Sequence, residues 1–172
     1  DRFRMTINKN IILIGFMGTG KTTVGQRLAD MLGWTFTDTD KQIEELAGKS
    51  IPEVFAEHGE EYFRQLETEV IHRISSQDRL VVSTGGGAVL KAANREAMLR
   101  SGLVVALKAD AETIISRVRG DTNRPLLAGD LEGKVNQLLQ ERAGAYDFAH
   151  VTIDTSNMAV EDIVRVILTH TT

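Results

Sequence analysis

The amino-acid sequence predicts an α/β fold, a three-layer α/β/α arrangement around a five-stranded parallel sheet. Short apolar runs alternate with longer segments whose apolar residues recur at helical spacing. A glycine-rich stretch, GFMGTGKT at positions 15–22, follows the first apolar run and precedes the first helical segment. With 172 residues, of which 42% are hydrophobic and 26% charged, the chain has the size and composition of one globular domain.

The predicted strands are short apolar runs that end at glycines or at polar turns. The first run leads into the glycine-rich stretch, the second ends at Asp38-Thr39-Asp40, and the third is broken by Gly85-Gly86-Gly87. In chain order, we predict strands at 10–14, 35–37, 80–83, 104–107 and 151–153. The carboxyl ends of parallel strands share one edge of a sheet, and ligands bind at that edge.

The predicted helices have apolar residues at helical spacing and end at characteristic residues. The first helix carries Val24, Leu28 and Leu32 on one face, with Gly33 at the C-cap position, and Pro52 stands in the first turn of a later helix. We predict helices at 21–32, 41–47, 51–58, 60–76, 92–100, 111–119, 131–146 and 160–170. Residues 120–130 are polar and turn-rich, so we expect a mobile loop there.

The composition excludes several classes of protein. The chain has no cysteine, so disulfides and thiolate metal sites are impossible, and a reducing cytoplasm is the expected location. The formal net charge is −4 and no basic run is present, so we expect no nucleic-acid partner. No apolar stretch approaches the roughly 20 residues that span a bilayer, so we expect no membrane association.

The stretch Gly15-x-x-x-x-Gly20-Lys21-Thr22 has the spacing of a phosphate-binding loop. Its glycines let backbone N–H groups point at one anion, and the following helix adds the positive end of its dipole. Lys21 is expected to reach the β- and γ-phosphates and to be catalytic, and the Thr22 hydroxyl is placed to bind Mg²⁺. A chance glycine-rich turn is the alternative, but the flanking strand and helix supply the context that the motif requires. The ATP-binding residues predicted here are Gly18, Thr19, Gly20, Lys21, Thr22 and Thr23.

A metal-binding carboxylate is missing from the strand where phosphate-loop ATPases usually carry it. The apolar run at 80–83 ends in a glycine turn, and Asp110 after a later strand is better explained as a helix N-cap. Asp38 and Asp40 follow the second strand, and alternate residues of an extended segment face one side. We expect one to serve the metal or the reacting hydroxyl and the other the substrate; a helix-capping role is the alternative.

Further short motifs follow along the chain. They are Asp38-x-Asp40, Gly59-Glu60-x-x-Phe63-Arg64-x-x-Glu67, Ser83-Thr84-Gly85-Gly86-Gly87, Arg124-Pro125-Leu126-Leu127 and Arg142-x-x-x-Tyr146. In this order and spacing the sequence resembles the shikimate kinases, from about residue 10 to the last helix. The resemblance implies a P-loop kinase fold with small substrate-binding and lid segments. It also implies transfer of the γ-phosphoryl group of ATP to the 3-hydroxyl of shikimate, in the chorismate pathway to aromatic amino acids, with Mg²⁺ as cofactor and a monomeric enzyme.

The resemblance implies an acceptor site suited to a small ring with one carboxylate and three hydroxyls. Arg64 and Arg142 match the carboxylate-binding arginines, since a guanidinium fork binds a carboxylate bidentately. Asp40 matches the ligand of the substrate hydroxyls, and the Gly85-Gly86-Gly87 turn matches one that presents N–H groups to the substrate. Glu67 would orient Arg64; for either arginine, an ion pair on a helix surface is the alternative.

On the donor side, the resemblance implies further roles for residues outside the phosphate loop. Asp38 matches a catalytic carboxylate whose first role is to associate with Mg²⁺ and whose second role is to assist removal of the hydroxyl proton. Arg124 matches a catalytic lid arginine that reaches the transferring phosphate of ATP. Arg117 and Pro125 match positions that flank the adenine, although an exposed helix residue and a loop breaker are the alternatives. Arg119 could share in nucleotide binding and has no assigned role.

As a single kinase domain, the chain divides by this resemblance into a core at 10–37, 77–117 and 131–172, a substrate-binding segment at 38–76 and a lid at 118–130. Residues 1–4 precede Met5 and are expected to be an added remnant. Another small-molecule kinase with this fold, gluconate- or nucleotide-kinase-like, is the alternative function. A GTPase switch is disfavoured because Asn8-Lys9 precedes the first strand, whereas a guanine-reading Asn-Lys-x-Asp follows a late one.

Overall fold

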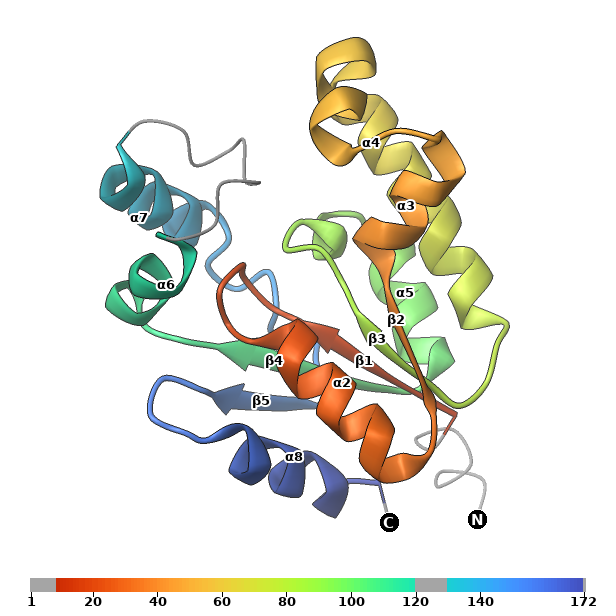
Figure 1. Ribbon diagram of the computed structural model, residues 1–172, viewed down its shortest axis with the longest axis vertical. Coiled ribbons are helices and arrows are strands. Elements are labelled where there is room, and N and C mark those ends of the chain that lie inside the picture. The colour runs from red at the N-terminus through yellow and green to blue at the C-terminus, as the bar shows by residue number, and fades with distance from the viewer. Residues whose placement is uncertain (1–8, 120–129, 172) are drawn as a thin grey trace.

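The computed structural model describes residues 9–119 and 130–171, in which five strands form one parallel sheet (Figure 1). The strands are β1 (Asn10–Ile14), β2 (Thr35–Asp38), β3 (Leu80–Ser83), β4 (Leu103–Lys108) and β5 (Val151–Asp154). Their order across the sheet is β2-β3-β1-β4-β5, and each neighbouring pair is parallel. The predicted α/β class with a five-stranded parallel sheet is confirmed.

Helices cover both faces of this sheet, as Figure 1 shows. They are α2 (Lys21–Leu32), α3 (Thr39–Ala47), α4 (Ile51–Ser75), α5 (Ala92–Ser101), α6 (Ala111–Val118), α7 (Leu131–Glu141) and α8 (Val160–Thr169), with a 3-10 turn, η1, at Ala88–Leu90. The central strand explains the layering, because successive side chains point to opposite faces. Ile11 and Leu13 pack with α2 and α8, whereas Ile12 and Ile14 pack with α4 and α5.

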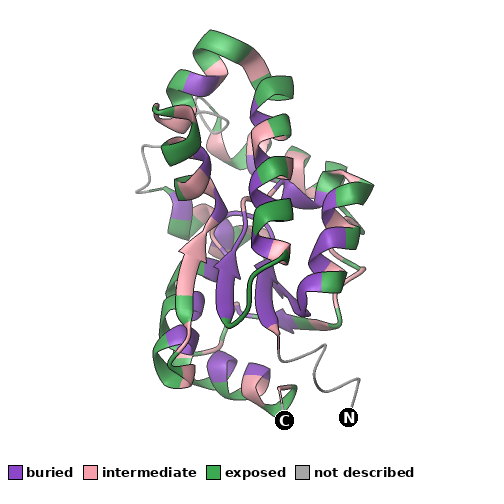
Figure 2. Ribbon diagram, turned by 90° about the vertical axis from the view of Figure 1, so that its right-hand side faces the viewer, coloured by how far each residue is buried: buried purple, intermediate pink, exposed green. Residues whose placement is uncertain are grey.

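A smaller apolar cluster supports the glycine-rich loop that follows β1. Phe16 and Met17 from the loop pack against Ile114 and Val118 of α6 and against Val135 of α7. The centre of the sheet is buried, whereas the arm formed by α3 and the start of α4 is largely exposed (Figure 2). The loop therefore rests on a packed base at the carboxyl edge of the sheet.

One predicted helix boundary is confirmed and another is wrong. The helices predicted at 51–58 and 60–76 are the two arms of α4, which is interrupted at Gly59 by a φ of 82° and a ψ of 176°. The prediction that the helix starting at residue 131 continues to 146 is wrong, because α7 ends at Glu141. Arg142 already leaves helical geometry at φ −101° and ψ 10°, and Gly144 has a left-handed φ of 83°.

No helix in the described ranges is long and apolar enough to span a membrane.

Candidate active site

The glycine-rich loop between β1 and α2 is closely packed. A Cβ at Gly15, whose φ is 145°, would lie 2.1 Å from the carbonyl oxygen of Leu107, so this position admits only glycine. Lys21 is buried, and its Nζ donates to the carbonyl oxygens of Gly15 at 2.7 Å and Phe16 at 2.9 Å. The ammonium group therefore lies within the curve of the loop, where a phosphate-binding lysine is required.

Arg117 on α6 joins this loop to the segment after β5. Its Nη1 donates to the Gly18 carbonyl at 2.9 Å, and its Nη2 donates to the Thr155 carbonyl at 3.3 Å. The Thr155 hydroxyl in turn donates to the Thr19 carbonyl at 3.0 Å. Arg117 is thus an exposed residue of α6 whose guanidinium is held against the loop.

Arg119 is placed differently from Arg117. Its Nη2 lies 3.6 Å from Glu132 Oε1, and both side chains are mostly exposed, so the pair contributes little to stability. Arg124 and Pro125 lie outside the described residues.

Asp38 and Asp40 reach the site from two different elements. Asp38 is the last residue of β2 and caps α3, since its Oδ1 accepts the backbone N–H of Asp40 at 2.8 Å. Asp40 lies in the first turn of α3. The expectation that both belong to one extended segment is therefore wrong. Both nevertheless line one cavity of about 190 Å³, together with Lys21 and Thr22.

The glycine turn after β3 forms the opposite wall of this cavity. None of its three residues has a positive φ, so conformational freedom does not explain them. Space does: a Cβ at Gly85 would lie 2.9 Å from Asp40 Oδ1, and one at Gly86 would lie 2.9 Å from Arg142 Nη1. A Cβ at Gly87 would lie 2.4 Å from Arg64 Nη2. Each glycine thus makes room for one charged side chain.

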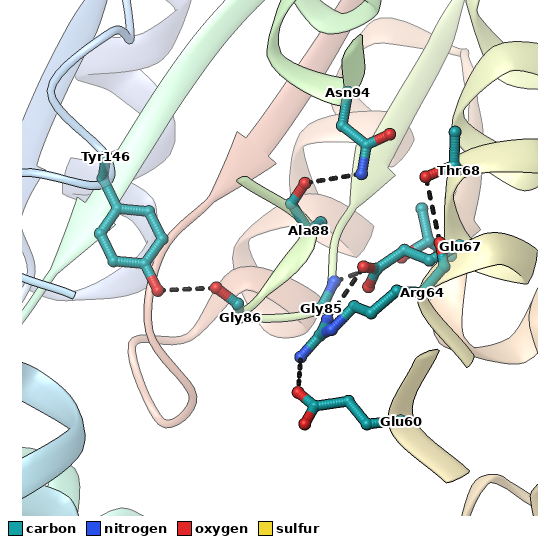
Figure 3. Close-up of polar contacts among 10 residues, drawn as sticks. Glu60, Arg64, Glu67, Thr68, Gly85, Gly86, Ala88, Asn94 and Tyr146 are labelled. Carbon is teal, nitrogen blue, oxygen red and sulfur yellow. Dashed lines mark hydrogen bonds and ion pairs between the residues drawn. The ribbon is translucent and has the colours of Figure 1, made fainter. Parts of the chain in front are cut away.

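Arg64 lies between two carboxylates of its own helix, as Figure 3 shows. Its Nη1 donates to Glu67 Oε1 at 2.9 Å, and its Nη2 lies 3.5 Å from Glu60 Oε1. The Glu67 side chain has no exposed surface, whereas Glu60 is 64% exposed, so Glu67 is the stronger partner. Burial raises the pKa of the Glu67 carboxyl, and the charge and hydrogen bond of Arg64 oppose that rise.

Arg142 occupies the other side of the glycine turn. It is buried, and its Cζ lies 5.6 Å from the centre of the Phe16 ring. Two cationic side chains, Arg64 and Arg142, therefore lie against adjacent glycines, close to the phosphate-binding loop. A planar guanidinium is the group that best binds a carboxylate.

One backbone donor of the turn is already engaged. The N–H of Gly85 donates to the hydroxyl of Thr39, a fully buried side chain, at 3.2 Å. The expectation that all three glycines present N–H groups to a substrate is therefore wrong for Gly85.

A larger hollow of about 570 Å³ lies beside β2, between α2, α3 and α4. It shares Asp38 with the smaller cavity but contains no residue of the phosphate-binding loop. The smaller cavity is the candidate active site, because it alone of these two brings the predicted donor and acceptor residues together.

The chain is similar to known proteins over most of its length. A model of the family described as shikimate kinase matches residues 17–172. A shikimate kinase of Pelotomaculum thermopropionicum is 46% identical over 167 residues, covering 94% of this chain and 97% of that protein. A shikimate kinase from Acinetobacter baumannii, solved in complex with shikimate, has a TM-score of 0.89 at 43% identity and covers 95% of this chain and 93% of that one.

The chain belongs to the shikimate kinase family. A gluconokinase from Sinorhizobium meliloti has a TM-score of 0.61 at 18% identity, which shows a shared fold alone.

For this member of the shikimate kinase family, the structure brings most of the predicted site residues together. Those lining the cavity are Gly18, Gly20, Lys21, Thr22, Thr23, Asp38, Asp40, Gly85 and Gly86. Gly87 is the last residue of the turn, and the side chains of Arg142 and Arg64 lie against Gly86 and Gly87. Thr19 is buried and its hydroxyl donates to the Phe16 carbonyl at 2.8 Å, so its side chain supports the loop.

Sequence reasoning missed the contacts of Thr39 and Thr155, which fix the glycine turn and the phosphate-binding loop from outside. Each stands beside a residue that the sequence did single out, but a hydroxyl in a polar turn has no distinctive pattern. The relevant signal is burial, since Thr39 and Thr155 are at most 1% exposed.

Proposed function

We propose that this chain transfers the γ-phosphoryl group of ATP to the 3-hydroxyl of shikimate, giving shikimate 3-phosphate and ADP. The observation that carries the proposal is one cavity of about 190 Å³ in which the phosphate-binding loop faces Asp40 and the glycine turn. Arg64 and Arg142 lie against that turn. The relative from Acinetobacter baumannii, solved with shikimate, supports the choice of acceptor.

We infer that cationic side chains bind one end of the acceptor and that an anionic side chain binds the other end. Arg64 and Arg142 would bind the carboxylate through their guanidinium forks. Asp40 would accept hydrogen bonds from ring hydroxyls, and the backbone of Gly86 and Gly87 would approach the ring closely. A nucleotide acceptor would need no such carboxylate clamp, which disfavours a nucleotide kinase.

The donor site would be formed by the loop and by residues from the neighbouring strands. The N–H groups of residues 18–23 would hold the phosphates, with Lys21 neutralising their charge. Arg117 would flank the adenine with Pro125, because its guanidinium is already held at the edge of the loop. Arg124 would contact the transferring phosphate from the lid.

The donor set suits Mg²⁺ better than a metal that needs a full protein cage. In the described residues no group of three or more histidine, cysteine, aspartate or glutamate side chains could hold a metal ion, and Mg²⁺ usually takes only one or two protein ligands. Thr22 and Asp38 line the same cavity and would be those ligands. Bound there, the ion would neutralise charge on the phosphates.

Asp38 would act mainly by holding the metal and only secondarily as a base. The transition state of phosphoryl transfer is loose, so positioning and charge neutralisation matter more than proton removal. Its Oδ1 also accepts the Asp40 N–H at 2.8 Å, which ties the metal-binding and acceptor-binding carboxylates to one helix terminus. The two carboxylates are thereby kept in a fixed relation.

We further infer from the family resemblance that the protein works as a monomer. Its lack of cysteine suits the reducing cytoplasm, which we propose as its location. Size-exclusion chromatography with light scattering tests the monomer. Coupled ADP release with shikimate, gluconate and AMP in turn tests the activity. Turnover with AMP or gluconate but not with shikimate would refute the proposal.

A further inference from the structure

The three glycines after β3 have no side chains that could fix their backbone, and their carbonyl groups are held in different ways. The carbonyls of Gly85 and Gly87 accept backbone N–H groups three residues further along, each at 3.1 Å. The carbonyl of Gly86 instead accepts the hydroxyl of Tyr146, 60 residues away in sequence, at 2.7 Å (Figure 3). This is a hydrogen bond of ordinary length from a distant part of the chain.

Gly86 is also where the donor and acceptor sides of the site meet. A Cβ built on it would lie 2.9 Å from Arg142 Nη1, 3.6 Å from the Met17 nitrogen and 3.7 Å from the Gly15 oxygen. Glycine rotates about its backbone bonds more freely than any other residue. A rotated peptide at Gly86 would therefore disturb both the arginine and the phosphate-binding loop.

Tyr146 is well placed to prevent that rotation. Its ring packs against the core cluster on the α4 and α5 face of the sheet, and this packing fixes the position of the hydroxyl. Burial raises the pKa of this hydroxyl, while the charge of Arg142 acts in the opposite direction. The hydroxyl therefore donates to the Gly86 carbonyl at a position close to Arg142.

We propose that Tyr146 is a positioning residue for the acceptor: its hydroxyl holds the Gly86 peptide in one arrangement beside the Arg142 guanidinium and the phosphate-binding loop. The proposal rests on the proposed function for the identity of the acceptor. Tyr146 does not line the cavity, so it acts through Gly86.

The test is Tyr146→Phe, which removes the hydroxyl and keeps the ring. Tyr62→Phe on α4 is the matched control, because Tyr62 is 37% exposed and lies outside the site. We expect Tyr146→Phe to raise the KM for shikimate about tenfold, the effect of leaving a buried carbonyl without its donor. The KM for ATP should stay within about twofold, and Tyr62→Phe should change neither.

Two kinetic outcomes would overturn the positioning role. One is a shikimate KM within about twofold of the wild type in Tyr146→Phe. The other is a lower kcat with both KM values unchanged, because that pattern indicates a smaller folded fraction rather than a displaced binding group.

A second measurement needs no turnover. In isotope-labelled protein without ligands, the amide resonances of Gly86 and Gly87 should shift in Tyr146→Phe and stay unchanged in Tyr62→Phe. Unchanged resonances in Tyr146→Phe would refute the role of the hydroxyl, whatever the acceptor is. A wild-type protein that releases no ADP with shikimate would instead refute the proposed function, and the resonances would still decide the role of Tyr146.

Discussion

Gly87 lies so close to the Arg64 guanidinium that a methyl group here must displace it. A Cβ at Gly87 falls 2.4 Å from Nη2, 2.5 Å from Nη1 and 2.7 Å from Cζ, whereas ordinary contact begins at 3.4 Å. The guanidinium must therefore move by about 1 Å. The backbone need not change, because Gly87 has φ −96° and ψ 4°, which alanine can adopt.

The functional cost of Gly87→Ala follows from this displacement. A misplacement of about 1 Å in a binding group can cost roughly 100-fold in rate. We expect Gly87→Ala to lower kcat/KM for shikimate by that factor, which corresponds to about 2.7 kcal/mol. The KM for ATP and the melting temperature should change little, since the atoms that move are the end of a long side chain.

The assay is coupled ADP release, analysed as a double-mutant cycle with Arg64→Ala. If Gly87→Ala acts by displacing Arg64, it should cost less than about threefold once Arg64 is already removed. Two results would refute the reasoning. One is a single variant whose kcat/KM for shikimate stays within about threefold of the wild type, and the other is a double variant in which the two losses multiply in full.

Three further predictions concern the donor side and stability. Arg117→Ala should raise the KM for ATP about tenfold, because the Arg117 guanidinium binds the Gly18 carbonyl of the phosphate-binding loop. The KM for shikimate should stay within about twofold, and an equal rise in both KM values would contradict the prediction. Arg124→Ala should lower kcat about 100-fold and leave the affinity for ATP little changed, because the proposed contact of Arg124 with the phosphate would form only late in the reaction. Isothermal titration measures the affinity for ATP, and single-turnover kinetics measure the rate of transfer. An unchanged kcat would exclude a catalytic role for Arg124. His150 Nδ1 accepts the Val104 N–H at 2.9 Å, and burial lowers the pKa of His150. The unfolded chain therefore binds more protons below about pH 6.5, so the free energy of unfolding should fall as pH drops through that value. His150→Asn keeps a hydrogen-bond acceptor that does not titrate, so its free energy of unfolding in urea should fall less over this pH range than that of the wild type. Identical pH profiles for the two proteins would refute the prediction.

The order of strands and helices could be predicted because each element has a local signal. The central strand is apolar from Ile11 to Ile14, since both of its faces are buried, and α2 begins directly after Gly20, which lies in the left-handed region. The phosphate-binding loop could be predicted for the same reason: its function depends on backbone conformation, which the spacing of glycines determines.

The parts of the site that depend on tertiary contacts could not be predicted. Asp40 was expected on an extended segment, but the cap that Asp38 provides starts α3 one residue before it. The helix after residue 130 was extended past Glu141, although Gly144 was a local signal against that extension. The glycine turn was expected to bring its backbone N–H groups close to the substrate, whereas in the structure the missing Cβ atoms also leave room for the side chains of Asp40, Arg142 and Arg64.

The sheet order explains why this site has glycines where other phosphate-loop proteins have a metal-binding aspartate. β3 lies between β1 and β2, and Ser83 is in register with Leu13 on one side and with Asp38 on the other. The turn after β3 is therefore flanked by the phosphate-binding loop and by the Asp38 carboxylate. The Asp38 carboxylate at the end of β2 can bind the metal from there, so the turn after β3 does not have to supply a metal ligand. With no side chains of its own, the turn lets the arginines on its far side approach the phosphate-binding loop. Any side chain in this turn would separate donor from acceptor, so we expect these three positions to tolerate substitution less well than the helix surfaces around them.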